Sequence, residues 1–251
     1  MSFHCAAYYS SVSATGSDTE LAALQDQILT ISNNRFLFRE NRRLLWGSAI
    51  GTSVYNASIS APSFSNITTP YLSYGIEQSD NPTNLPAVED WTMSPFNLAA
   101  REELSFRVSG TAGGVVEDNY GILGIEFNPV PAPRTSYYCL RGTSTTAAVA
   151  NSWTELSVTW QNQLPAGRYA VVGGNGVSVG GIGFRFIIQD QLPRPGGLCT
   201  TQFVNQNWKG FSNGYLGNWG EFESFVMPGV EILNETTTAD HTFYMTIAKI
   251  G

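Results

Sequence analysis

One string in the sequence matches the nucleophile pattern of serine hydrolases. Gly176-Val-Ser178-Val-Gly180 has the Gly-x-Ser-x-Gly spacing, and Asp190 and His241 follow it in the order Ser, Asp, His. That pattern requires a strand followed by a helix. Here the string precedes Ile182-Gly-Phe-Arg-Phe-Ile-Ile188, which is a strand pattern. The context therefore favours a glycine-rich hairpin, and we expect no catalytic residues in it.

A pair of carboxylates is the other candidate for chemistry. Glu221 and Glu223 flank Phe222, so on a strand both would point to one face. Retaining glycosidases hold two carboxylates ~5 Å apart, and Trp219 lies close by as an aromatic platform for a sugar ring. Alternating charges on any half-exposed strand give the same pattern without a function. A carbohydrate-binding or glycoside-cleaving β-sandwich stays open as the alternative function.

Residues that hold metals or cofactors are scarce. His4 and His241 are the only histidines, and Cys5, Cys139 and Cys199 form neither a zinc spacing nor a disulfide framework. The chain has no glycine-rich phosphate loop. We therefore expect no metal, no cofactor, no small-molecule substrate and no enzymatic activity.

An apolar stripe marks the only segment with a helical period. Leu21, Leu24, Ile28 and Ile31 recur at three- and four-residue steps, which predicts a short helix that begins at Ser17 or Asp18 and ends at Asn33-Asn34. Residues 1–17 have no such period and little to pack. We expect an N-terminal arm and helix over residues 1–33 that lies at an inner or intersubunit surface.

Four arginines follow this segment: Arg35, Arg39, Arg42 and Arg43. Such a cluster can contact nucleic acid or an acidic partner surface. Ion pairs with Glu40 and with acids upstream are the plain alternative. Together with Leu21, Leu24 and Ile28, these arginines are our candidates for contacts in an assembly.

Charge is sparse over the whole chain. Its 251 residues carry 13 Lys and Arg against 20 Asp and Glu, a net charge of −7, and only 13% are charged, against ~25% in an average protein. The acidic balance argues against a whole-surface attraction to nucleic acid or anionic lipid, and the low charge suits burial in an assembly. The N-terminal residues lack a signal-peptide pattern, so we expect synthesis in a cytoplasm.

Short apolar runs rich in Val, Ile, Tyr, Phe and Thr fill the chain from Arg35 onward. About thirteen of them are bounded by Gly, Pro or Asn, which predicts an all-β protein of sandwiches or barrels and excludes βαβ folds. The proline-rich stretch 128–134 near the midpoint is the best candidate for a linker. The predicted domains are the arm at 1–33 and two sandwiches, at 34–130 and 131–251.

Several short sequence motifs in the second half of the chain resemble those of a known protein family. They are Trp153-Thr-Glu-Leu-Ser-Val-Thr-Trp160, Leu164-Pro-Ala-Gly-Arg-Tyr-Ala-Val-Val-Gly173, Phe184-Arg-Phe-Ile-Ile188, Arg194-Pro-Gly196, Leu216-Gly-Asn-Trp-Gly-Glu-Phe222 and Met227-Pro-Gly229, and looser matches cover 35–45 and 97–104. Together they resemble the small major capsid proteins of tailless icosahedral bacterial viruses.

This resemblance implies two eight-stranded jelly rolls in tandem, joined into homotrimeric pseudo-hexameric capsomers that self-assemble into an icosahedral shell. It places the chain in the virion of a bacteriophage. The implied partners are the chain itself, neighbouring capsomers, minor capsid or vertex proteins, and an internal membrane or genome near the N-terminal region. The predicted strands are too few for two complete eight-stranded sandwiches, so a single elaborated jelly roll is the structural alternative.

Overall fold

The computed structural model describes residues 2–13, 19–51, 54–64, 71–73, 88–92, 94–110, 116–128, 137–161, 163–189, 191–200 and 218–251. All regular elements in these ranges are β-strands, so the prediction of an all-β chain is confirmed. Among the described residues, no helix has the length and apolar character that a membrane span requires.

The chain divides into two compact units. One, the N-terminal unit, holds Ala6–Ile125, and the other, the C-terminal unit, holds Met1–Cys5 together with Glu126–Gly251. The expected linker and the expected boundary at residues 130 and 131 lie outside the described residues.

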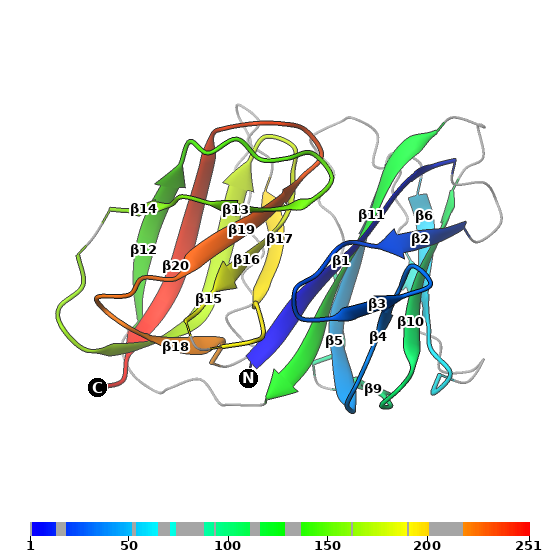
Figure 1. Cartoon of the computed structure of the whole chain (residues 1–251), viewed down its shortest axis with the longest axis horizontal. Helices are drawn as coiled ribbons and strands as arrows, with labels where there is room; N and C mark the ends of the chain where they lie inside the picture. Colours follow the sequence, from blue (N-terminus) through cyan, green and yellow to red (C-terminus); the bar gives the residue numbers. More distant parts are fainter. Residues whose placement is uncertain are drawn as a thin grey trace. The chain divides into compact units, whose positions relative to one another are not determined.

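An 11-stranded sheet forms the N-terminal unit, in the order β3-β4-β10-β2-β1-β11-β5-β8 with β6, β7 and β9 off this path (Figure 1). Its strands are β1 (Ser2–Val12), β2 (Thr19–Ala23), β3 (Thr30–Ser32), β4 (Arg35–Leu37), β5 (Arg42–Ile50), β6 (Val54–Ser60), β7 (Tyr71–Ser73), β8 (Glu89–Asp90), β9 (Phe96–Leu98), β10 (Glu103–Gly110) and β11 (Glu117–Asn128). The first residues of β1 and the last of β11 belong to the C-terminal unit.

The predicted N-terminal helix is wrong where the structure describes it. β2 runs antiparallel to β1 and to β10, with Leu21 opposite Phe106 and Ala23 opposite Tyr8. Pairing on both sides satisfies the backbone of this segment and buries Leu21 completely, which outweighs a weak helical period. After β2 the chain turns at Asp26, whose carboxylate accepts hydrogen bonds from the backbone N–H groups of Ile28 and Leu29 at 2.7 and 3.0 Å.

Asn33 and Asn34 form a hairpin turn instead of a helix end. Both residues have positive φ angles, 51° and 63°, and they join β3 to β4. Two successive residues of positive φ match a turn whose twist suits paired strands, and asparagine tolerates this conformation better than most residues.

β1 also differs from the expected loose arm. Phe3 and Cys5 to Tyr8 are fully buried. The Tyr8 hydroxyl donates a hydrogen bond of 2.6 Å to the Leu104 carbonyl, and its ring lies edge-on to Phe36 with centroids 4.9 Å apart. The N-terminal strand is therefore part of the core, and the sequence signal for it was hidden by its Ala- and Ser-rich composition.

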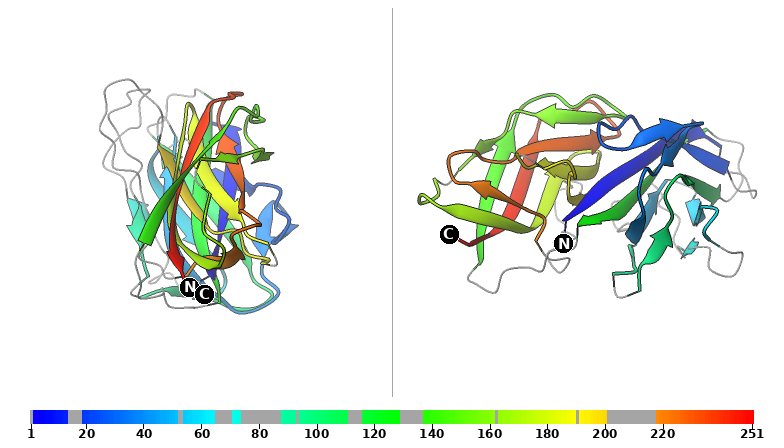
Figure 2. Two further views of the ribbon diagram at one scale, coloured as in Figure 1. Left: turned by 90° about the vertical axis from the view of Figure 1, so that its left-hand side faces the viewer. Right: turned by 60° about the horizontal axis from the view of Figure 1, so that its bottom comes forward.

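A 9-stranded sheet forms the C-terminal unit, in the order β13-β19-β16-β17-β15-β20-β12-β14 with β18 paired to β15 (Figure 2). Its strands are β12 (Tyr137–Ser144), β13 (Trp153–Leu156), β14 (Thr159–Trp160), β15 (Arg168–Ser178), β16 (Gly181–Ile187), β17 (Gly196–Thr200), β18 (Gly220–Glu223), β19 (Gly229–Asn234) and β20 (His241–Lys249).

Strand β17 links two parts of this sheet, because it pairs in parallel with β15 and antiparallel with β16. Phe184 on β16 lies with its ring centroid 6.4 Å from that of Phe243 on β20, and both side chains are fully buried. These contacts join strands far apart in the sheet order, so the unit folds over its own apolar core as a β-sandwich does.

Candidate functional site

The hydrolase-like string lies where β15 ends and β16 begins. Gly180 has a φ of +67° in the turn between the two strands, which suits glycine. The context thus contains two strands, as predicted, rather than a strand and a helix. The prediction of a hairpin is wrong, because β15 and β16 are not hydrogen-bonded neighbours in the sheet order.

Ser178 and His241, the first and last members of the suspected triad, do meet. The Ser178 Oγ lies 2.9 Å from the His241 Nδ1, and the His241 Nε2 lies 3.1 Å from the Thr146 carbonyl oxygen. A carbonyl only accepts, so Nε2 carries the proton and Nδ1 accepts from the serine hydroxyl. Asn234 donates to the same hydroxyl oxygen at 3.1 Å, while Asp190 lies outside the described residues.

This serine–histidine pair is closed to solvent. Ser178 and Asn234 are fully buried and His241 is 2% exposed, and burial lowers the pKa of His241 from its ordinary value. A catalytic nucleophile needs a route by which its substrate can reach it. A pocket opens in the C-terminal unit, but none of these three residues is among its described lining residues. Their geometry ties together the ends of β15, β19 and β20.

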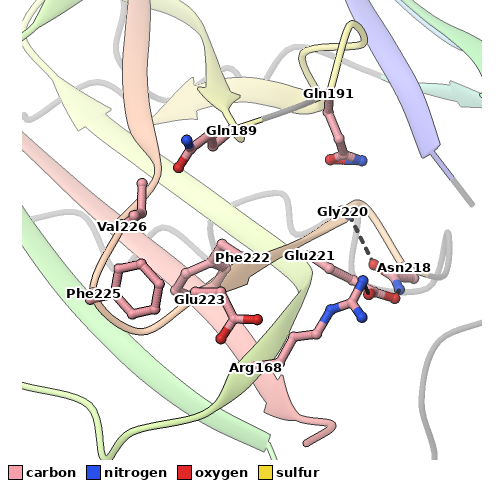
Figure 3. A pocket seen from close by; sticks show the side chains of 10 residues that line it. All are labelled: Arg168, Gln189, Gln191, Asn218, Gly220, Glu221, Phe222, Glu223, Phe225 and Val226. Atoms are coloured by element: carbon pink, nitrogen blue, oxygen red, sulfur yellow. Dashed lines mark hydrogen bonds and ion pairs between the residues drawn. The ribbon is translucent and has the colours of Figure 1, made fainter.

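The two candidate carboxylates both line a pocket of about 510 Å³ in the C-terminal unit. Glu221 and Glu223 flank the buried Phe222 on β18, as the alternation predicts. Figure 3 shows Gln189 and Gln191 reaching toward β18 from one side, with Arg168 beside Glu221.

Charge in the pocket is unevenly compensated. Arg168 lies 2.6 Å from Glu221, which also accepts a hydrogen bond of 2.9 Å from the Asn218 side chain. No ion pair of Glu223 is seen within the described ranges. The Oε1 atom of Gln191 is buried and has no hydrogen-bond donor among the described residues, and Phe225 at the rim is 82% exposed. The pocket therefore offers polar groups and an exposed aromatic ring.

Trp219 does not face this pocket. It is fully buried, with its ring 5.2 Å from Phe3 in an edge-on contact and 6.0 Å from Phe186. Its backbone N–H donates to the Val171 carbonyl at 2.7 Å. Trp219 is a core residue and cannot serve as a sugar platform. Regular alternation would place it on the face of Glu221 and Glu223, but it precedes β18, and Gly220 at the start of that strand has a φ of 155° that interrupts the alternation.

The arginine cluster is divided between ion pairs and free surface. Arg35 binds Glu20 through two hydrogen bonds, of 2.5 and 2.9 Å, and this contact lowers the pKa of Glu20. Arg42 pairs with Glu40 at 2.9 Å, whereas Arg39 is exposed. The plain alternative of local ion pairs thus holds for Arg35 and Arg42.

The remaining predicted contact residues are scattered. Arg43 is half-buried in β5, and Leu24 and Ile28 are half-buried in the turn after β2. Leu21 is buried in the sheet. The apolar stripe therefore does not exist as one surface, because it depended on a helix.

A second exposed arginine stands beside Arg39. The Arg101 N–H donates to the Phe38 carbonyl at 2.7 Å, and the Phe38 N–H donates to the Glu102 carbonyl at 3.0 Å. These bonds hold the loop after β4 against the loop before β10. The sequence contained no signal for this pair, since more than sixty residues separate the two arginines.

A buried charged cluster holds the N-terminal segment in the C-terminal unit. Arg185 and Arg194 both contact the Glu231 carboxylate, and Arg185 also donates to the Cys5 carbonyl at 3.2 Å. The Arg194 backbone N–H donates to the His4 Nδ1 at 3.1 Å. Arginine in a run such as Phe184-Arg-Phe-Ile-Ile188 indicates a strand, but its buried partner cannot be found from the sequence.

No protein-family model matches the chain, and no curated protein matches it. Among solved structures, the chain is similar to the crystal structure of the major capsid protein P2 from bacteriophage PM2. The two share 8% sequence identity over 98% of each chain, with a TM-score of 0.25.

Proposed function

We propose that this chain is a major capsid protein of a tailless icosahedral bacteriophage. Three copies form a pseudo-hexameric capsomer, and capsomers self-assemble into the shell of the virion. The phrases quoted above support this, and the observation that carries it is that one chain folds into two compact all-β units.

Two similar units in one chain suit a capsomer because each copy then supplies two places in the ring. A closed ring of three chains repeats both places by rotation, which gives a hexagonal outline from a three-fold assembly. The N-terminal unit has 11 strands and the C-terminal unit has 9. Each unit therefore has enough strands for an eight-stranded jelly roll, which supports two tandem jelly rolls over the alternative of a single elaborated one.

A structural role also accounts for the surface. Phe225 and Leu192 are 82% and 74% exposed, and large apolar side chains of this kind are covered in assemblies. Neighbouring capsomers and minor capsid or vertex proteins are the proposed partners. We assign contact with a genome or an internal membrane to exposed loops rather than to an N-terminal arm, because β1 is part of the core.

Native mass spectrometry of the purified chain at micromolar concentration tests this function. The expected species is a trimer with three times the 27.3 kDa mass of the chain. A stable monomer that forms no larger species under any assembly condition would contradict the proposal.

Carbohydrate binding is the second candidate function, and the pocket that Glu221 and Glu223 share favours it. Side-chain amides, carboxylates and an exposed ring are typical of groups that bind sugars. The buried Trp219 stands against it. Oligosaccharide binding or cleavage that disappears in Glu221→Gln, with the fold intact, would support this candidate over the capsid protein.

A further inference from the structure

The pocket of the C-terminal unit has the composition of a protein–protein contact. The exposed ring of Phe225 lines it, and the exposed Leu192 follows Gln191 on the opposite loop. Interfaces place an aromatic anchor in a patch that polar groups surround. Here Gln189 and Glu223 provide such groups beside the ring (Figure 3).

The charge of this pocket is negative. Arg168 contributes +1 and the carboxylates of Glu221 and Glu223 contribute −2, so the described lining carries −1. Arg168 is engaged with Glu221 at 2.6 Å, which leaves the exposed Glu223 to attract a cation. A guanidinium that approaches Phe225 can also stack on its ring.

The N-terminal unit carries a matching positive surface, formed by Arg39 and Arg101. Both side chains are exposed. Two acids lie in the same loops: Glu40 pairs with Arg42 at 2.9 Å, and Glu102 accepts the Ala99 N–H at 3.1 Å and keeps its charge. Arg39, Arg42 and Arg101 contribute +3 and Glu40 and Glu102 contribute −2, so these loops carry a net charge of +1.

These loops are held in a fixed and unusual conformation. Arg101 has a φ of 70°, a left-handed conformation that few non-glycine residues adopt. It is fixed by the Arg101 hydrogen bond to Phe38 and by the Asn41 side chain, which accepts the Ala100 N–H at 2.9 Å. Strain of this kind at an exposed turn points to a role in contacts.

We propose that the pocket around Glu223 and Phe225 receives the Arg39 and Arg101 loops of a second copy of this chain. The inference rests on the proposed capsid function and names one of its contact surfaces. The occupant is a second copy because the chain carries both complementary halves, one on each unit. A contact between unlike patches on successive copies closes into a trimeric ring when each copy is rotated by a third of a turn from the last.

Charge reversal tests the contact. Glu223→Arg and Arg101→Glu should each weaken trimer formation by about tenfold or more, measured by native mass spectrometry or analytical ultracentrifugation, because each places like charges together. The double variant restores an opposite pair and should recover most of the lost affinity. Glu155→Arg and Arg141→Glu are matched controls, since both residues are exposed on other strands of the C-terminal unit. These controls should assemble as the original chain does.

The outcomes separate this contact from the function. If the original chain forms no trimer, the proposed function fails. If it forms trimers that neither reversal weakens, or if the double variant recovers nothing, this contact alone is overturned. Unweakened trimers combined with loss of nucleic-acid binding in Arg101→Glu would assign the arginine loops to a genome and overturn the contact as well. Circular dichroism and thermal melting check that each variant keeps its fold.

Discussion

The Nε of Arg185 lies 2.5 Å from a carboxylate oxygen of Glu231, and both side chains are almost completely buried. The same guanidinium lies 4.3 Å from the ring centre of Trp153 and donates to the Cys5 carbonyl. Arg194 contacts the second carboxylate oxygen. One carboxylate thus serves two buried arginines, and the first residues of the chain complete their hydrogen bonds.

Glu231→Gln should destabilise the protein by about 3–5 kcal/mol, because it leaves two buried guanidiniums without their counter-charge. Urea denaturation measures this change. Glu155→Gln is the matched control, since Glu155 lies opposite Glu231 in the β13–β19 pairing but is exposed. An equal stability of Glu231→Gln and the original chain would contradict the role of this cluster.

Phe3→Ala should cost about 3–5 kcal/mol, because it opens a cavity beside Trp219 in the core of the C-terminal unit. Deletion of residues 1–16 should prevent stable folding altogether, whereas a loose arm could be removed without harm. Thermal melting separates the two cases. The control is Val149→Ala at an exposed side chain, which should change stability by less than about 0.5 kcal/mol.

Gly196→Ala should be strongly destabilising. A Cβ at this position would lie 1.9 Å from the Phe184 carbonyl oxygen, which belongs to the backbone of the neighbouring strand and cannot move aside cheaply. Gly229→Ala is the matched control, because its nearest contact would be Ile187 at an ordinary 3.4 Å. Normal expression and melting of Gly196→Ala would show that β16 and β17 do not approach this closely.

The free energy of unfolding should decrease as the pH is lowered, because His241 titrates. Burial lowers its pKa in the folded protein, so below the unfolded value of ~6.5 the unfolded chain binds more protons than the folded one. The stabilisation is therefore complete above this value and is lost as the pH falls toward the folded pKa. Urea denaturation at pH 7.5 and pH 5 measures the loss, which His241→Gln should reduce. An unchanged pH dependence in that variant would exclude His241 as the source.

Local patterns predicted most strands from β5 onward, because alternation and turn residues are properties of short segments, but they missed the short strands β8 and β9. The same patterns placed Glu221 and Glu223 on one face, and the structure agrees. They did not reveal β1, whose small residues show no clear period, and they indicated a helix where β2 pairs on both sides. Segment 19–32 shows that long-range pairing decides the outcome when the local preference is weak.

Side-chain partners were the least predictable part of the site. The chain order Ser178, Asp190, His241 suggested a catalytic group, and the structure joins Ser178 to His241 but closes both to solvent. The Arg185–Glu231 pair and the Arg39–Arg101 loops each bring together residues that lie 46 or more positions apart. Such contacts depend on the order of strands in the sheet, which short-range patterns do not contain.

Electron microscopy of particles assembled from the purified chain tests the capsid function most directly. The predicted result is a closed shell tiled by capsomers of hexagonal outline, each built from three copies with two β-sandwich units per copy. Discrete monomers, or aggregates without any hexagonal unit in every assembly condition, would contradict the capsid function and would make carbohydrate binding at the Glu221 and Glu223 pocket the leading candidate.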